Sequence, residues 1–261
     1  MSTQSEEIVR VEIEERIATV TLNRPERRNA LSRALYRRIP AVLTELDQDD
    51  KVEILILTGA DPAFCAGVDL KELSETPPGE GEEDGRNPWR GPIPPLEKPL
   101  LGAINGAAIT GGLEVALACD FLVASERAAF ADTHARVGIM PGDGLTVRLA
   151  EAVGLRRAKE MSTTGNFVLA DEAGRIGLVN HVVPHEELLP FTRSLATDIL
   201  SNDASGVRQM LSTYDQVAET TAEEGWKIED RISRTWRGGD VDGEEVARRR
   251  DRIMERGRKQ I

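Results

Sequence analysis

Two short glycine-bearing segments constrain most strongly what this chain can fold into. They are residues 64–70, which contain Gly67, and residues 105–114, which contain Gly111 and Gly112. Each segment follows an apolar run that predicts a strand, and each leads into a pattern typical of a helix. A junction of this kind leaves backbone N–H groups without partners at the helix start. Two junctions side by side predict a site where two N–H groups hold one oxyanion, as reactions that place negative charge on a carbonyl oxygen require.

Strands and helices alternate along the first part of the chain. The pattern of residues 9–22 predicts two strands joined as a hairpin, and Ser32 is suited to cap the helix that follows. This alternation predicts an α/β fold with a mainly parallel sheet. The predicted strands are residues 9–14, 17–22, 52–58, 100–105, 121–124, 128–131 and 178–183, and the predicted helices are residues 33–48, 70–73 and 113–118.

The sequence becomes mostly helical from residue 145 onward. We therefore expect a core over residues 1–200 and a helical C-terminal region over residues 201–261. Helices are predicted at residues 186–200, 206–219, 221–236 and 244–258. The last of these is strongly basic, which is typical either of a solvated helix face or of a contact with phosphates or an acidic neighbour.

Composition excludes several classes of partner. The net charge of −12 argues against general nucleic-acid binding and against anionic membrane surfaces. The two cysteines, Cys65 and Cys119, form neither a disulfide framework nor a metal-ligand pattern, so no metal site is expected. The polar N-terminus lacks the features of a secretory signal, and no apolar run approaches the ~20 residues of a membrane span. We therefore expect a cytoplasmic protein.

Several motifs in a fixed order resemble those of the enoyl-CoA hydratase/isomerase (crotonase) superfamily. They occupy residues 22–31, 59–73, 98–114, 118–120 and 138–142. The resemblance extends over roughly residues 8–205. It implies a spiral of ββα units with a helical C-terminal trimerisation region, assembled as a homotrimer or a dimer of trimers. It also implies stabilisation of a thioester enolate of an acyl-CoA, with coenzyme A as part of the substrate and no separate cofactor.

The resemblance assigns the oxyanion donors and the coenzyme A contacts to the same turns. The two donor N–H groups would belong to Val68 and Gly111. The carbonyl of Ala66 and the side chain of Leu70 would cradle the adenine, and nearby cations would suit the phosphates, although the arginines also suit a solvated turn. The full set assigned to coenzyme A is Arg27, Arg28, Ala30, Ala66, Asp69, Leu70 and Lys71.

Glu114 matches one of the two carboxylates with which this family hydrates an enoyl-CoA. The second carboxylate is expected at the position of His134, and the chain has no glutamate from residue 127 to residue 150. Histidine can exchange protons near neutral pH, so a His–Glu pair could still carry acid–base chemistry. In an extended segment Asp132 would face the same side as His134 and could orient its ring. Asp143 is either an ordinary turn residue or an additional acidic group.

Three functions remain open on the sequence. The first is a hydratase that adds water to a 2-enoyl-CoA, with Glu114 as the main acid/base and His134 as its partner. The second is another acyl-CoA reaction of this superfamily, such as isomerisation, decarboxylation or thioester hydrolysis. The third is a weakly catalytic acyl-CoA-binding paralogue, which the missing glutamate motivates. His181 and His185 lie outside the motifs and are predicted to be structural.

Overall fold

The computed structural model describes residues 7–75, 89–236, 247, 249–250 and 254–258. The chain divides into two compact units, Met1–Ser201 and Asn202–Ile261. Among the described residues, no helix is both long enough and apolar enough to cross a membrane.

The first unit contains a six-stranded sheet in the order β1-β2-β3-β5-β7-β10. β1 and β2 form the predicted antiparallel hairpin, and the strands from β2 to β10 pair in parallel. Its strands are β1 (Val9–Glu14), β2 (Ile17–Leu22), β3 (Ile54–Gly59), β5 (Leu100–Ile104), β7 (Phe121–Ser125) and β10 (His181–Val183).

A second sheet of four very short strands accompanies the first, in the order β4-β6-β8-β9. Its strands are β4 (Ala63–Cys65), β6 (Ala107–Ile109), β8 (Ala129–Ala131) and β9 (Val168–Leu169). β4, β6 and β8 each follow a strand of the large sheet and precede a helix. These helices are α2 (Leu70–Glu75), α3 (Gly111–Leu117) and α4 (His134–Val137). Three successive strand–strand–helix units therefore build the core, as the resemblance implied.

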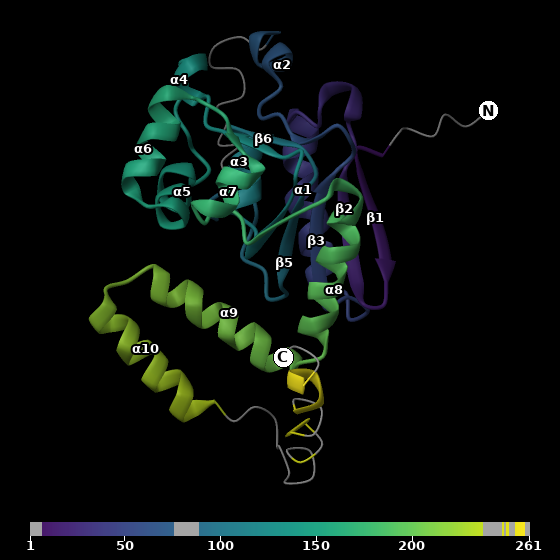
Figure 1. Ribbon diagram of the computed structural model, residues 1–261, viewed down its shortest axis with the longest axis vertical. Coiled ribbons are helices and arrows are strands. Elements are labelled where there is room, and N and C mark those ends of the chain that lie inside the picture. The colour runs from purple at the N-terminus through teal and green to yellow at the C-terminus, as the bar shows by residue number, and fades with distance from the viewer. Residues whose placement is uncertain (1–6, 76–88, 237–246, 248, 251–253, 259–261) are drawn as a thin grey trace, which may run out of the picture. The chain divides into compact units, whose positions relative to one another are not determined.

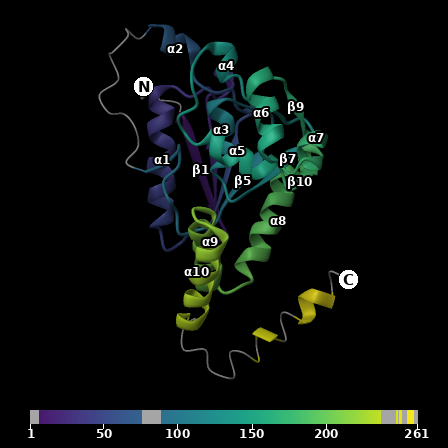
Figure 2. The same ribbon diagram turned by 90° about the vertical axis from the view of Figure 1, so that its left-hand side faces the viewer.

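Helices cover both faces of the large sheet. Alternate residues of β3 point to opposite sides: Leu55 and Leu57 pack in the cluster that contains α1 (Arg33–Asp47), and Ile54 and Ile56 pack against α8 (Leu188–Leu200). Figure 2 shows α1 and α8 on opposite sides of the strands. This two-sided burial explains why β3 is a continuous apolar run rather than an alternating one. The predicted cap also forms, because the Ser32 hydroxyl accepts a hydrogen bond from the Leu35 N–H.

The remaining helices lie from residue 145 onward, where the sequence is predicted to be mostly helical, and the two in the second unit match the predicted helices 206–219 and 221–236 except at their ends. In the first unit they are α5 (Leu145–Val153), α6 (Leu155–Thr164) and α7 (Ala170–Arg175), with the 3-10 turns η1 (Pro25–Arg27) and η2 (His185–Glu187) (Figure 1). The second unit contains α9 (Ala204–Ala218) and α10 (Ala222–Thr235). Much of the predicted helix at residues 244–258 lies outside the described residues, and the described residues 247, 249–250 and 254–258 are helical.

Candidate active site

The backbone around Val68 leaves one N–H group directed away from its neighbouring segment. Leu31 and Val68 form an isolated parallel bridge, in which the Leu31 N–H donates to the Gly67 carbonyl (2.7 Å) and the Asp69 N–H donates to the Leu31 carbonyl (3.0 Å). In such a bridge the central residue points its own N–H to the opposite side. The Val68 N–H is therefore available as a donor.

Gly111, the second predicted donor, is the first residue of α3. The first N–H groups of a helix have no acceptor within the helix. The preceding residue, Thr110, has a φ of 55° and no capping contact from its side chain, and its N–H donates to the Ala131 carbonyl (2.8 Å). A Cβ atom placed on Gly111 would lie 3.9 Å from the Val68 nitrogen. The two predicted donor residues are thus neighbours in space.

The close approach of the two junctions depends on glycine. A Cβ atom on Gly112 would lie only 2.1 Å from the Cys65 carbonyl oxygen. Gly67 has a φ of 89°, and a Cβ there would lie 2.7 Å from the Ile109 carbonyl oxygen. A side chain at Gly112 would push the end of β4 and the start of α3 apart, and one at Gly67 would push the turn after β4 away from the end of β6. The glycines that the sequence singled out therefore have a direct steric role.

Glu114 lies in the first turn of α3 and is almost fully buried, with 3% of its surface exposed. Its Oε1 atom accepts hydrogen bonds from the backbone N–H groups of Asp143 (2.9 Å) and Leu145 (3.4 Å). Burial raises the pKa of Glu114 above the ordinary carboxyl value, and the negative charge of Asp143 acts in the same direction. The Asp143 N–H and a nearby His134 oppose this shift. A carboxyl group with a raised pKa is suited to exchanging protons near neutral pH.

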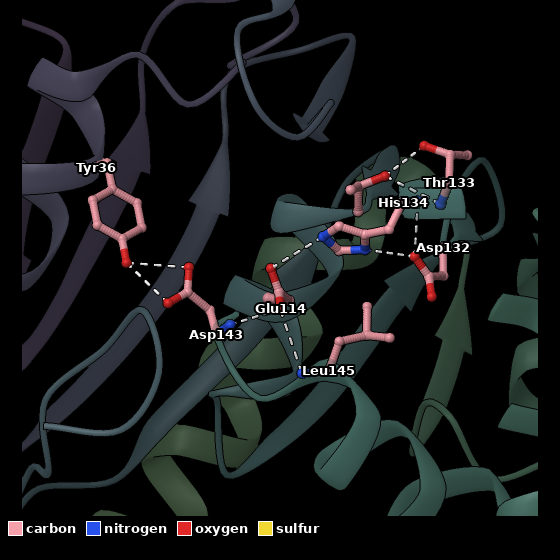
Figure 3. A network of polar contacts seen from close by, with 8 residues as sticks. Tyr36, Glu114, Asp132, Thr133, His134, Asp143 and Leu145 are labelled. Atoms are coloured by element: carbon pink, nitrogen blue, oxygen red, sulfur yellow. Dashed lines mark hydrogen bonds and ion pairs between the residues drawn. The ribbon is translucent and has the colours of Figure 1, made fainter. Parts of the chain in front are cut away.

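His134 faces Glu114 across a short gap. Its Nε2 atom lies 3.7 Å from Glu114 Oε2, which is longer than a direct hydrogen bond. Its Nδ1 atom lies 2.6 Å from Asp132 Oδ1, and both residues are buried. Figure 3 shows Glu114, His134 and Asp132 in one continuous chain of contacts. The structure thus brings together the pair that the sequence predicted.

The prediction of an extended segment at His134 is wrong. His134 is the first residue of α4, and its backbone N–H donates to Asp132 Oδ1 (3.1 Å). The same carboxylate oxygen therefore contacts both the backbone and the ring of His134. Asp132 does orient the ring, as expected, but through the start of a helix rather than through strand alternation.

Tyr36 and Asp143 complete the polar network on the other side of Glu114. The Tyr36 hydroxyl donates to the Asp143 carboxylate, with O–O distances of 2.9 and 3.1 Å. Burial and the charge of Asp143 raise the pKa of Tyr36 above its ordinary value, so its hydroxyl stays protonated at neutral pH. Tyr36 lies on α1, outside the motifs and 107 positions from Asp143, and nothing in its local pattern distinguishes it from a helix residue packed on the core.

The turns assigned to coenzyme A also lie together. The Ala66 N–H donates to the Arg28 carbonyl (3.0 Å), which joins the two segments. Arg27 and Arg28 are exposed. Lys71 is exposed as well, with its Nζ 4.0 Å from a Glu75 carboxylate oxygen, and Leu70 is 54% exposed. These side chains can be reached by a ligand.

Ala30 and Asp69 have an internal partner that the sequence did not reveal. The Arg24 guanidinium donates to the Ala30 carbonyl and forms an ion pair with Asp69 (3.0 Å). Burial works against the charged form of Asp69, but hydrogen bonds led by that from Arg24 hold its pKa below the usual value. Asn29, which was also missed, is fully buried, and its amide donates to the carbonyls of two residues between β3 and the end of β4.

The other histidines make structural contacts, as predicted. His185 lies 3.0 Å from both Ser125 Oγ and Asp61 Oδ2, and the His181 ring packs edge-on against Phe191. Both cysteines are free thiols. Within the described part of the chain, no three or more His, Cys, Asp or Glu side chains are placed to hold a metal ion.

A spiral of ββα units with two adjacent N–H donors beside a buried acid–histidine pair defines a protein equipped to stabilise an oxyanion and to move protons next to it. Comparison with known proteins gives the family. The enoyl-CoA hydratase/isomerase family matches residues 12–238, and the chain belongs to this family.

Individual relatives agree with this assignment. The chain is 41% identical over 217 residues to a probable peroxisomal enoyl-CoA hydratase of Arabidopsis thaliana, covering 82% of this chain and 80% of the relative. It is 38% identical over 223 residues to the crotonyl-CoA hydratase of Syntrophomonas wolfei, covering 84% and 85%. The crystal structure of an enoyl-CoA hydratase from Mycobacterium tuberculosis matches with a TM-score of 0.74 and 47% identity, covering 87% of this chain and 97% of that one.

Proposed function

We propose that this protein is an enoyl-CoA hydratase that adds water to the double bond of a 2-enoyl-CoA. The observation that carries the proposal is the buried pair of Glu114 and His134, 3.7 Å apart, next to the donors Val68 and Gly111. Hydration needs an oxyanion site together with two proton-exchanging groups. The named hydratases among the relatives support the same reaction.

The oxyanion site holds the thioester oxygen of the substrate. When water attacks C3 of the enoyl group, the electrons of the double bond move toward C1 and the negative charge develops on this oxygen. The N–H groups of Val68 and Gly111 donate to it. Each such donor typically contributes ~2.7–4 kcal/mol of transition-state stabilisation, because the dipoles are already oriented before the reaction begins.

Glu114 and His134 divide the two proton transfers. Glu114 takes a proton from the attacking water, a task for which its raised pKa is suited. Protonated His134 then delivers a proton to C2 as the enolate collapses to the thioester. Asp132 holds the other ring nitrogen and fixes the orientation of the ring. Transfer of a proton from Glu114 to His134 across the 3.7 Å gap, directly or through water, then restores the starting protonation of both groups.

The coenzyme A portion binds at the joined turns. The cations Arg27, Arg28 and Lys71 contact its phosphates, and the Ala66 carbonyl and Leu70 hold the adenine. Ala30 and Asp69 belong to the same turns and shape them through Arg24. The reaction needs no cofactor besides the coenzyme A that the substrate carries.

Hydration of crotonyl-CoA tests the proposal, followed as loss of the ultraviolet absorbance of the conjugated thioester. We expect turnover by the wild type and a loss of about 10²–10⁴-fold in kcat for Glu114→Gln and for His134→Ala, because each change removes one general acid–base group. Glu126→Gln and His181→Ala are matched controls at exposed positions and should retain wild-type rates. Tight binding of crotonyl-CoA without any turnover would instead support the acyl-CoA-binding paralogue.

Two further expectations belong to this proposal. Assembly as a homotrimer or a dimer of trimers stays a prediction, which light scattering coupled to size exclusion can measure. A cytoplasmic location also stays a prediction, and it is a point on which relatives differ, since one is named as peroxisomal and another as mitochondrial. Imaging of the tagged protein in its native cell would decide it.

A further inference from the structure

Glu114 is held from two sides, and only one of them belongs to the His134 pair. On the second side, the residue that donates its N–H to Glu114 Oε1 is Asp143, whose carboxylate accepts from the Tyr36 hydroxyl. Figure 3 shows this arm opposite His134, with Asp143 between Tyr36 and Glu114. The contact ties helix α1 to the turn before α5.

This arm has both a geometric and an electrostatic consequence. The turn that contains Asp143 has glycine on both sides, and Gly144 has a φ of 96°, so its backbone has few constraints of its own. The bond to Tyr36 anchors the turn and thereby fixes the N–H that meets Glu114. The Asp143 carboxylate also places a negative charge beside Glu114, while His134 faces it from α4 with the opposite effect.

We infer that Tyr36 and Asp143 form a positioning pair: the Asp143 N–H, anchored through Tyr36, holds the Glu114 carboxylate in place, and the Asp143 carboxylate favours proton uptake by Glu114. The inference rests on the proposed hydratase function and adds a second control of Glu114 to it. In this proposal neither Tyr36 nor Asp143 contacts the substrate. The charged and titratable groups that act on Glu114 among the described residues are His134, backed by Asp132, on one side and Asp143, backed by Tyr36, on the other.

Two conservative substitutions separate the positioning of Glu114 from the effect of the Asp143 charge. Asp143→Asn removes the charge but keeps the backbone N–H and an oxygen that accepts from Tyr36. Tyr36→Phe removes only the hydroxyl. Asp50→Asn and Tyr214→Phe are matched controls at exposed positions, the second of them in the other unit. The measurements are kcat and KM for crotonyl-CoA as a function of pH, and the titration of Glu114 followed by carboxyl ¹³C NMR with Glu114→Gln for assignment.

For Asp143→Asn we expect the titration midpoint of Glu114, and the acid limb of kcat/KM with it, to fall by about half to one pH unit, because a like charge has been removed. For Tyr36→Phe we expect kcat to fall about tenfold with KM nearly unchanged, because a displaced catalytic group affects the chemical step more than binding. The double variant should lose less than the product of the two single losses, since both changes act through one contact.

Failure of the proposed function and failure of the positioning pair would give different results. A wild type that does not hydrate crotonyl-CoA refutes the proposed function, and the NMR titration then still decides whether Asp143 acts on Glu114. A wild type that turns over, with folded variants that keep its kcat and its Glu114 midpoint, refutes the positioning pair alone. A change confined to KM would also refute it.

Discussion

The substitution Gly112→Ala tests whether the oxyanion site depends on the close approach of its two backbone segments. A Cβ atom at this position would lie 2.1 Å from the Cys65 carbonyl oxygen and 2.9 Å from the Cys65 Cβ, where ordinary contacts are 3.4–4 Å. Because the nearest atom belongs to the backbone, no side-chain rotation can relieve the overlap. The start of α3 must move away from β4 by more than ~1 Å, and Gly111 moves with it.

The magnitudes follow from this displacement. Overpacking of a well-filled core typically costs ~1–3 kcal/mol, and we expect the upper half of that range because backbone must shift. For a chain of this size that corresponds to a fall of roughly 4–10 °C in Tm. A donor displaced by ~1 Å no longer aligns with the thioester oxygen, so kcat should fall about 10²-fold or more.

Thermal melts and crotonyl-CoA kinetics, measured well below the variant's Tm, check the two effects separately. The matched control is Gly257→Ala, because a Cβ there meets nothing within 4 Å and the residue is helical. We expect this control to keep its activity and to melt at or slightly above the wild-type temperature. A Gly112→Ala protein with wild-type kcat and Tm would show that the steric reasoning about the two junctions is incorrect.

Substitutions at three other positions test stability. Asn29→Ala should cost about 3–5 kcal/mol in urea unfolding, because it leaves buried backbone groups without partners, whereas Asn29→Gly should lose less owing to the positive φ of 54°. Asp69→Asn should destabilise the protein at neutral pH by about 1–3 kcal/mol. The difference in unfolding free energy between wild type and variant should shrink as pH falls through the lowered pKa of Asp69, because the wild type then loses the charge paired with Arg24. Glu114→Gln should raise Tm at neutral pH. Because the pKa of Glu114 is raised in the folded protein, the wild type loses stability as pH rises through that pKa, and the glutamine variant does not. In acid, where Glu114 is protonated, the two proteins should have the same Tm.

The sequence predicts the structure correctly wherever a local pattern carries the structural information. The glycine segments, the hairpin, the Ser32 cap and the Glu114–His134 pair all follow from residues close together in the chain or from motifs in a fixed order. The contacts that were missed join distant segments. Tyr36 meets Asp143 across 107 positions, and its helix shows only an ordinary buried face.

Three strands of the small sheet were missed for a different reason, whereas β8 lies within the predicted strand at residues 128–131. β4 and β6 have three residues each and β9 has two, which is too short for an alternating pattern to emerge. They exist because tertiary pairing supplies their hydrogen bonds. The predicted helix beginning near residue 113 starts at Gly111 for the same reason: packing of α3 against β4 selects the helix start, and two glycines give no helical signal of their own.

The structure also explains how a histidine can stand where a carboxylate was expected. Asp132 is buried and lies 2.6 Å from the ring of residue 134. A glutamate at that position would place a second negative charge beside this carboxylate, in addition to Glu114 and Asp143, and at least one of these groups would have to be protonated. With histidine at this position, the Asp132 carboxylate is instead a hydrogen-bond partner that fixes the orientation of the ring. Asp132 and His134 therefore form a hydrogen-bonded pair, and in the proposed mechanism the departure from the family pattern redistributes charge without removing an acid–base group.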